Sequence, residues 1–350
     1  MKAAVWHGKK DIRIEEVADP VAEPGKVVLK VKACGICGSD LHEYTSGPII
    51  IPTEKPDPLT GQIAPIILGH EFSGEIVDLG SNVKGWQIGD RVTVDPAVAC
   101  WNCPLCKRFQ YNQCAKLACT GLSENGAFAE FVSVRDYQLN RLNDEVSWIE
   151  GAVVEPLAVG VHAVVRSSLA LGENVVILGS GTIGLAVLQA ANAAGAANVY
   201  MVGGSEKRRE LALKLGASKV FPANSNDALQ EIKELTGGSG PDVCFECVGK
   251  EETVNQCLAL TRSGGRIVIV GVFRDKSLID CNEFSLQEKD IIGCRAYAGD
   301  FKTVISLLSN AKMQADMLVT KEIELKDIVE EGFKTLLGKQ KDQVKIIVSF

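Results

Sequence analysis

The sequence contains no long apolar run and no apolar leader. Its apolar segments stop short of the roughly 18 residues that a membrane-spanning helix needs. The N-terminal stretch MKAAVWHGKKDIRIEE lacks the apolar h-region of a secretory signal peptide. We therefore expect a soluble, cytoplasmic protein without a membrane partner.

Positive charge is also scarce. The 350 residues carry a formal net charge of −7, and aromatic residues, at 6%, are not interleaved with any basic patch. A nucleic acid partner is therefore not expected. Hydrophobic residues at 46% and charged residues at 23% are ordinary for a globular chain, and the length allows about two domains.

Cysteine, in contrast, is abundant, with 12 residues. In a reducing compartment such a number indicates metal ligands or buried thiols rather than a disulfide framework.

Two kinds of segment follow each other along the chain. Residues 1–150 contain short β-branched runs separated by glycine and proline, which predict strands, and the proline-rich stretch 46–65 predicts a long surface loop. After a predicted helix pair within 147–168, strand-like and helix-like runs alternate, as in a doubly wound parallel sheet. The strand-like end, VKIIVSF, could return to the first domain.

A glycine-rich turn lies between a predicted strand and a predicted helix. Gly179 permits a tight turn, Gly181 lets the backbone approach a pyrophosphate, and Gly184 permits close packing of the helix on the strand. The helix N-terminus then offers N–H groups to the phosphates. The candidate cofactor residues of this motif are Gly179, Gly181, Thr182, Ile183 and Gly184. A plain glycine turn is the alternative interpretation.

The end of the second predicted strand bears on the choice of dinucleotide. An NAD enzyme needs a carboxylate there, but this chain has Gly203 and Gly204. Glycine leaves room for a 2′-phosphate, to which Ser205 can donate a hydrogen bond and Arg208, Arg209 or Lys207 can supply positive charge. We therefore predict NADP over NAD. In the alternative, Arg208 is solvated and Glu206 binds the ribose of NAD.

Four cysteines with regular spacing predict a structural metal site. They are Cys100, Cys103, Cys106 and Cys114. The pattern C-x2-C-x2-C-x7-C can surround one tetrahedral zinc ion with no open position. Such a lobe has almost no core of its own and depends on the metal for stability. An iron–sulfur cluster is the main alternative.

A second set of ligand types is scattered along the chain. Cys37 lies in CGICGSDLH, His70 precedes Glu71 in LGHEFSGE, and Glu155 lies in VVEPLAVG. One thiolate, one imidazole and one carboxylate leave a fourth position open, as in catalytic zinc sites. Zinc at such a site lowers the pKa of an alcohol and favours hydride loss to a nicotinamide. By residue type and spacing alone, coincidence is an alternative.

Over essentially its whole length, the chain resembles the zinc-dependent medium-chain alcohol dehydrogenases. The motifs that carry the resemblance are CGICGSDLHEY, GHEFSGE, VEPLAV, the glycine turn, the four-cysteine lobe and DQVKI. Within the family, SDLHEY and the loop PIIIPTEKPDPLTG are most similar to the (R,R)-butanediol dehydrogenase branch, close to sorbitol dehydrogenase.

The resemblance implies an α/β fold of two domains. A GroES-like, β-rich catalytic domain would comprise residues 1–155 and 295–350, with the structural zinc lobe at about 96–119. A Rossmann doubly wound parallel-sheet domain would comprise residues 156–294. The resemblance also implies a homodimer or homotetramer.

The resemblance further implies roles for individual residues. Cys37, His70 and Glu155 would ligate the catalytic zinc, so that each chain holds two Zn²⁺ ions. Glu71 would be an exchanging or supporting ligand, and it is easily confused with Glu155. Cys34 would be a packed thiol.

Proton transfer and nicotinamide binding are implied in the same way. Ser39 would hydrogen-bond the substrate oxygen, and His42 would pass the proton to water. Asp40 suits either support of a zinc-bound histidine or a turn. Val248, Gly271 and Val272 would border the nicotinamide at the strand ends.

Together these features predict a zinc-dependent oxidoreductase that transfers a hydride between NADP and a secondary alcohol or ketone. The expected substrate is a small diol or hydroxyketone, 2,3-butanediol or acetoin (diacetyl). One alternative is a polyol dehydrogenase of the sorbitol or threonine type. Another is a non-catalytic nucleotide-binding protein on the same fold.

Overall fold

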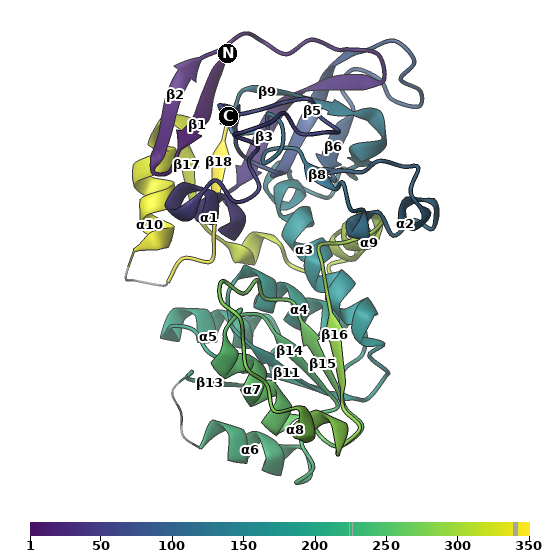
Figure 1. Cartoon of the computed structure of the whole chain (residues 1–350), viewed down its shortest axis with the longest axis vertical. Helices are drawn as coiled ribbons and strands as arrows, with labels where there is room; N and C mark the ends of the chain where they lie inside the picture. The colour runs from purple at the N-terminus through teal and green to yellow at the C-terminus, as the bar shows by residue number, and fades with distance from the viewer. Residues whose placement is uncertain (224, 226, 339–341) are drawn as a thin grey trace. The chain divides into compact units, whose positions relative to one another are not determined.

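The computed structural model describes residues 1–223, 225, 227–338 and 342–350. The chain forms two compact units (Figure 1). The first contains Met1–Glu155 and Val319–Phe350, and the second contains Pro156–Leu318.

The first unit is built on sheets whose strands pair antiparallel, except for the parallel pair β17 and β18. A three-stranded sheet has the order β2-β1-β4, and a seven-stranded sheet has the order β10-β6-β5-β3-β18-β17, with β9 also paired to β3. The bounds are β1 Lys2–Gly8, β2 Asp11–Glu16, β3 Lys26–Gly35, β4 Ile66–Ile67, β5 Glu71–Leu79, β6 Arg91–Val94, β9 Phe131–Arg135, β10 Leu139–Arg141, β17 Val319–Glu324 and β18 Lys345–Ser349.

Large side chains fill the core of the first unit. Trp6, Phe72 and Phe128 are fully buried, and the Phe128 ring lies 6.3 Å from that of Phe333, centroid to centroid. Burial of each such side chain contributes about 1.5–3 kcal/mol. Because Phe333 comes from the C-terminal segment, this core is complete only when that segment is in place. The helical segments of that part are η4 Leu325–Asp327, η5 Ile328–Phe333 and α10 Lys334–Leu337.

The remaining elements of the first unit are short. Helix α1, Gly38–Ser46, follows β3 directly. The cysteine-rich lobe contains β7 Ala97–Val98, α2 Pro104–Lys107, η1 Tyr111–Gln113 and β8 Ala118–Cys119, and η2 Asp136–Gln138 follows β9. Figure 1 shows α2 on a loop that projects from the sheet of this unit.

Residues expected to form two helices form one, α3, Trp148–Ser167. Pro156 cannot donate a backbone hydrogen bond, yet Val154, Leu157 and Ala158 around it are all fully buried. Packing therefore holds the helix together across the proline. Helix α3 also has the length and mean hydropathy of a membrane span, which the sequence analysis did not anticipate, but 67% of its apolar window is buried in the protein.

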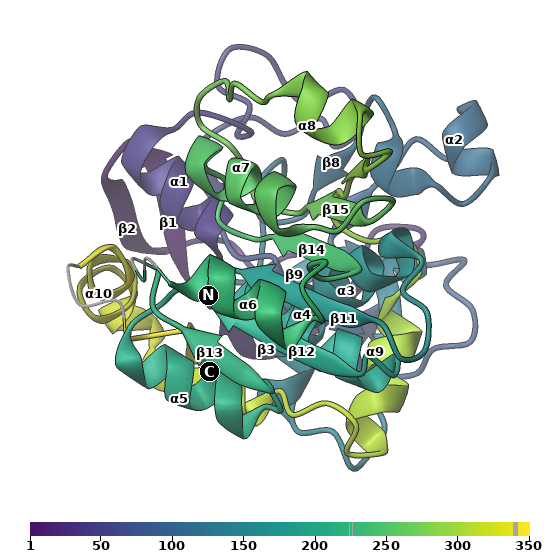
Figure 2. The same cartoon turned by 90° about the horizontal axis from the view of Figure 1, so that it is seen from below.

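The second unit is a parallel six-stranded sheet of order β13-β12-β11-β14-β15-β16. Its strands are β11 Asn174–Leu178, β12 Asn198–Val202, β13 Lys219–Phe221, β14 Val243–Glu246, β15 Arg266–Ile269 and β16 Asp290–Gly293. Its helices are α4 Thr182–Ala193, α5 Glu206–Lys214, α6 Ala228–Leu235, α7 Glu251–Leu260, α8 Cys281–Ser285, α9 Phe301–Ser309 and the short η3 Asp316–Leu318. The central strands are mostly apolar and buried because helices cover the sheet, and Figure 2 shows α6 beside α7 in this covering.

The second unit extends further along the chain than expected. Residues 295–318, expected in the first domain, belong to the second unit. The Asp300 carboxylate lies 2.9 Å from Nδ1 of His162, and the N–H of Gln314 donates to Oε1 of Gln189 at 2.6 Å. These contacts, together with the buried face of α9, place the return to the first unit at Val319 instead of residue 295.

Candidate active site and metal centres

Cys37, His70 and Glu71 come together in the first unit. One ligand atom from each lies within 4.8 Å of the others. The pairing of β3 with β5 sets Gly35 opposite Glu71, so the residues just after β3 meet those at the start of β5. Sequence separation therefore does not prevent these three side chains from sharing one ion.

Asp40 contacts two members of this group. Its Oδ2 accepts the backbone N–H of Cys37 at 2.9 Å, and its Oδ1 lies 3.3 Å from Nδ1 of His70. A carboxylate on the far nitrogen of a metal-binding histidine fixes the ring orientation and its tautomer. Asp40 thus contacts both the first turn of α1 and the imidazole of His70.

Ser39 lies on the other side of the imidazole. Its Oγ is 3.2 Å from Nε2 of His70, the nitrogen that faces away from Asp40. Ser39 and His42 are three positions apart on α1, and this spacing puts them on neighbouring turns of one helix face.

Glu71 has a second partner that the sequence analysis missed. Nζ of Lys345 donates to its two oxygens at 2.7 and 2.6 Å and to the carbonyl oxygen of Ile36 at 3.0 Å. Both charged side chains are buried. A lysine within the apolar run VKIIV was the available signal, because a charge in a buried strand requires an opposite charge.

Burial and neighbouring charges shift the pKa values of this group. Burial, with the Glu71 charge, raises the pKa of the Cys37 thiol. Burial acts to lower the pKa of His70, but the charges of Asp40 and Cys37 outweigh it and raise that pKa well above its usual range. A divalent cation would stabilise the thiolate and the neutral imidazole. The donor set of one sulfur, one nitrogen and one carboxylate therefore fits zinc with an open position.

Glu155, the carboxylate expected as third ligand, is not in this group. It lies within α3 and is 8% exposed. The structure thus brings together the alternative carboxylate, Glu71, because Glu71 directly follows His70 at the start of β5.

The four cysteines of the lobe also converge. The sulfur atoms of Cys100, Cys103, Cys106 and Cys114 all lie within 4.8 Å of one another. Backbone N–H groups of Asn102 and Cys103 lower the pKa of Cys100 to about 6. Four converging thiols fit a closed tetrahedral zinc site.

Cys34 and Cys119 are two of the cysteines that lie outside both groups. Cys34 is buried, and its sulfur would lie 2.9 Å from a Cβ at Gly69. Burial raises the pKa of Cys119 to about 12. Such thiols are protonated and unreactive, as expected for packed side chains.

The glycine turn of the second unit has the geometry that its sequence predicts. Gly179 has φ +110°, and a Cβ at Gly184 would collide with the carbonyl oxygen of Gly179. A Cβ at Gly181 would meet nothing within 4 Å, so its backbone is open to a phosphate. Thr182 and Ile183 then begin α4, whose N-terminus points backbone N–H groups out of the helix, as a phosphate site requires.

The end of β12 carries the residues expected to select the dinucleotide. Gly203 has φ +122° and Gly204 φ +80°, which favour glycine. Ser205 is the N-cap of α5, and Arg208 lies in its first turn. Arg209, next to Arg208, is engaged elsewhere, since its Nη1 donates to the Gly204 carbonyl at 2.8 Å.

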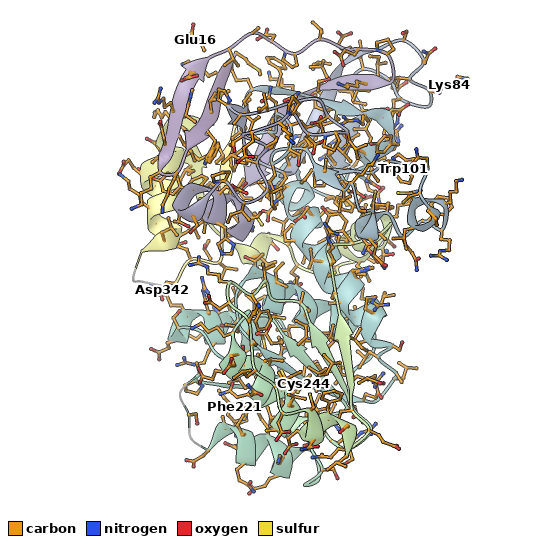
Figure 3. All side chains as sticks on the ribbon, viewed as in Figure 1. Glu16, Lys84, Trp101, Phe221, Cys244 and Asp342 are labelled. Atoms are coloured by element: carbon orange, nitrogen blue, oxygen red, sulfur yellow. The ribbon has the colours of Figure 1, made fainter. Side chains whose placement is uncertain are left out.

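The residues expected at the nicotinamide follow the ends of two strands. Strand β14 ends at Glu246, so Val248 lies in the turn that follows, where it is 40% exposed. Gly271 and Val272 follow β15, and Val272 is 74% exposed. Cys244 lies inside the sheet (Figure 3), whereas Cys247 lies beyond the strand. The two cysteines therefore do not form a metal site.

Comparisons with known proteins agree with this geometry. The family described as alcohol dehydrogenase GroES-like domain matches residues 23–144, and the family described as zinc-binding dehydrogenase matches residues 182–310. The (R,R)-butanediol dehydrogenase of Bacillus subtilis (strain 168) is 45% identical over 99% of both chains. Its crystal structure superposes with a TM-score of 0.94 at 44% identity, covering 100% of this chain and 99% of that chain.

Two other proteins are also similar. The sorbitol dehydrogenase of Bacillus subtilis (strain 168) is 35% identical over 99% of this chain and 97% of its own. A zinc-binding dehydrogenase from Sinorhizobium meliloti 1021, crystallised with NADP, has a TM-score of 0.91 at 30% identity and covers 100% of this chain and 99% of its own.

The fold and the two groups of ligands define an oxidoreductase that uses zinc and a nicotinamide dinucleotide. The chain belongs to the zinc-binding medium-chain alcohol dehydrogenase family, and it is an NAD(P)-dependent alcohol dehydrogenase.

Proposed function

We propose that the enzyme is an NADP-preferring dehydrogenase of vicinal diols and α-hydroxyketones, with 2,3-butanediol and acetoin as the substrate pair. The single observation that carries the proposal is the 45% identity to a butanediol dehydrogenase over nearly the whole chain. The group of Cys37, His70 and Glu71, with Ser39 against His70, is consistent with it.

Residues of the first unit would have the following roles in the reaction. Cys37, His70 and Glu71 would hold the zinc ion, which would lower the pKa of a substrate alcohol and, in the reverse direction, polarise a ketone. Ser39 would accept the substrate proton at Oγ while its own hydroxyl proton passes on to His42, and its position beside Nε2 of His70 supports this role. His42 exchanges that proton with water, because imidazole titrates near neutral pH.

The NADP preference has its own support. Positions 203 to 205 carry no acidic side chain, and Arg208 lies in the first turn of α5. A 2′-phosphate binds well to an arginine and to the N-terminus of a helix. NAD is the alternative, with Glu206 on the ribose.

A steady-state panel on zinc-replete enzyme tests the substrate and the cofactor together. We expect (R,R)-2,3-butanediol and acetoin to have the highest kcat/KM, above those of sorbitol and threonine, and NADP to be used better than NAD. Far better turnover of sorbitol would reject the diol assignment and favour a polyol dehydrogenase. The 35% identity to a sorbitol dehydrogenase makes this the second candidate.

We also propose a homodimer or homotetramer in the cytoplasm. Strand β16 is an edge of the six-stranded sheet, and Ile291 on it is 36% exposed. Leu278 and Leu286 nearby in sequence are each 81% exposed. An apolar edge strand is suited to pairing with a second copy.

A further inference from the structure

Helix α1 contains a buried carboxylate, Glu43, that the proposed chemistry does not use. Glu43 is 1% exposed. Its Oε2 accepts the backbone N–H of Ile49 at 3.0 Å, and its Oε1 accepts that of Ile50 at 2.5 Å. Both oxygens of Glu43 therefore hold the chain that follows the helix.

Gly47 is required for this arrangement. Its N–H donates to the carbonyl oxygen of Glu43 at 3.0 Å, and a Cβ at Gly47 would lie only 2.5 Å from Oε2 of Glu43. Only glycine lets the chain turn over the carboxylate. Glu43 and Gly47 thus fix the start of the segment 47–65.

The far end of segment 47–65 is fixed as well. Oγ1 of Thr60 donates to the carbonyl oxygen of Ser123 at 2.8 Å, and Oε1 of Gln62 accepts the N–H of Asn125 at 2.9 Å. The segment is therefore an ordered loop of the kind that often has a function.

Two isoleucines of this ordered loop face solvent. Ile49 is 61% exposed and Ile50 is 50% exposed, whereas Ile51 is 3% exposed. Two adjacent apolar side chains held outward by backbone hydrogen bonds leave an apolar surface available to a ligand.

Helix α1 connects this surface to the metal-ligating group. Ser39 and Glu43 are four positions apart on α1, so they share a helix face with about 5–6 Å between their Cβ atoms. Ser39 Oγ is 3.2 Å from Nε2 of His70. The backbone N–H groups of both isoleucines are bound to Glu43, and Glu43 lies one helical turn from Ser39.

We infer that Glu43 is a positioning residue that sets Ile49 and Ile50 as an apolar wall against the alkyl flanks of the substrate. This inference rests on the proposed function and deepens it. An alkyl flank leaves water when it packs on isoleucine, whereas a polyol hydroxyl in the same place loses hydrogen bonds to water. The wall therefore favours diols with short alkyl flanks over polyols.

The test changes the exposed side chains of the proposed wall and leaves the buried core unchanged. Ile49→Asn and Ile50→Asn change exposed side chains, and Ile88→Asn, at an isoleucine that is 65% exposed and outside the loop, is the matched control. We expect the ratio of kcat/KM for (R,R)-2,3-butanediol to that for sorbitol to fall about tenfold in each loop variant, through KM for the diol. The control keeps the wild-type ratio.

Glu43→Gln tests the positioning step. The amide retains one acceptor and turns a donor toward the other N–H, so the loop loses one hydrogen bond. We expect the same ratio to fall while KM for NADP stays at the wild-type value. A purely structural role would lower Tm and leave the ratio unchanged, which would overturn the role of Glu43.

Other outcomes are equally decisive. An unchanged ratio in both isoleucine variants overturns the inference. A change of solution mass at constant ratio also overturns it and assigns the isoleucines to a subunit contact. If the wild-type enzyme does not oxidise diols, the proposed function itself has failed.

Discussion

Glu71 lies between Lys345 on one side and Cys37 and His70 on the other. Its carboxylate is fully buried, pairs with Lys345, and lies within 4.8 Å of Cys37 and His70. The Lys345 charge compensates Glu71 without a metal ion. The side chains of the site can therefore adopt this arrangement before zinc binds. Without the lysine, burying the charged carboxylate would destabilise the fold by several kcal/mol.

The choice of carboxylate at the catalytic zinc gives a prediction. Glu71→Gln removes a ligand and leaves Lys345 buried without its partner. We expect the zinc content to fall from about two ions per chain to about one, and kcat/KM to fall more than about 100-fold. Elemental analysis and steady-state kinetics measure these effects. Glu155→Gln is the control and retains both ions; if it alone loses zinc, the ligand assignment is wrong.

Arg208 gives a second prediction at the scale of single residues. Arg208→Ala removes a charged donor proposed for the 2′-phosphate, so KM for NADP rises about 10- to 100-fold while KM for NAD changes little. Lys207→Ala, one position earlier on α5, is the matched control. Equal changes in KM for NADP and for NAD would show that Arg208 does not bind the 2′-phosphate.

Among the elements, the cysteine lobe depends most on metal. Two contacts join it to the rest of the first unit: the ring of Trp101 (Figure 3) lies 5.2 Å from that of Tyr137, and the hydroxyl of Tyr111 donates to Asp95 at 2.5 Å. These contacts anchor the base of the lobe, but its large apolar side chains Trp101 and Phe109 are 39% and 75% exposed and so contribute little to a core. Zinc must supply the rest of its stability.

Cys103→Ser therefore tests the lobe. We expect loss of one zinc ion per chain, a lower Tm, and faster proteolysis between residues 100 and 114, because three thiolates and a hydroxyl bind zinc poorly. Mass spectrometry of the fragments locates the cleavage. Cys119→Ser, outside the four-cysteine group, should keep both ions, and a similar loss there would contradict the assignment.

A pH-dependent contribution is expected where β10 meets the turn before β6. Both oxygens of Asp90 accept from Arg141, at 2.5 and 2.9 Å, and this contact lowers the pKa of Asp90 below its usual 3.8. A lowered pKa stabilises the fold above pH 3.8, and the stabilisation is lost as the pH falls through the folded-state value.

Asp90→Asn should accordingly lower the free energy of unfolding by about 1 kcal/mol at pH 7, since Arg141 is half exposed and solvent screens the pair. Urea unfolding at pH 7, 5, 4 and 3 should show a constant difference from wild type down to about pH 4 and a smaller one below it. Asp144→Asn, at a side chain that is 99% exposed, is the control. A difference that grows in acid would contradict this account.

The same elements show what the sequence could and could not predict. The glycine turn and the four-cysteine lobe were predictable because their residues are close in the chain and their spacing determines their geometry. The partner of Glu71 was not, since Lys345 reaches it only through the pairing of β18 with β3. The boundary at Val319 was missed because α9 has no local feature that assigns it to one sheet.

At the scale of the whole molecule, the exposed edge of the six-stranded sheet predicts assembly. Light scattering should give two or four times the chain mass of 37.5 kDa. Ile291→Lys places a charge on β16 and should reduce the mass to that of one chain, because lysine on an edge strand opposes pairing. Ile88→Asn should leave the assembly intact. A wild-type monomer would reject the oligomer.

The first unit is interrupted in the chain by the second, and this has a consequence for synthesis. Strands β17 and β18 leave the ribosome only after the whole of Pro156–Leu318 has been made. During translation the nucleotide-binding unit can fold while the metal-binding unit still lacks two strands and the lysine that faces Glu71. We therefore expect the earliest-made half of the protein to be the last to mature.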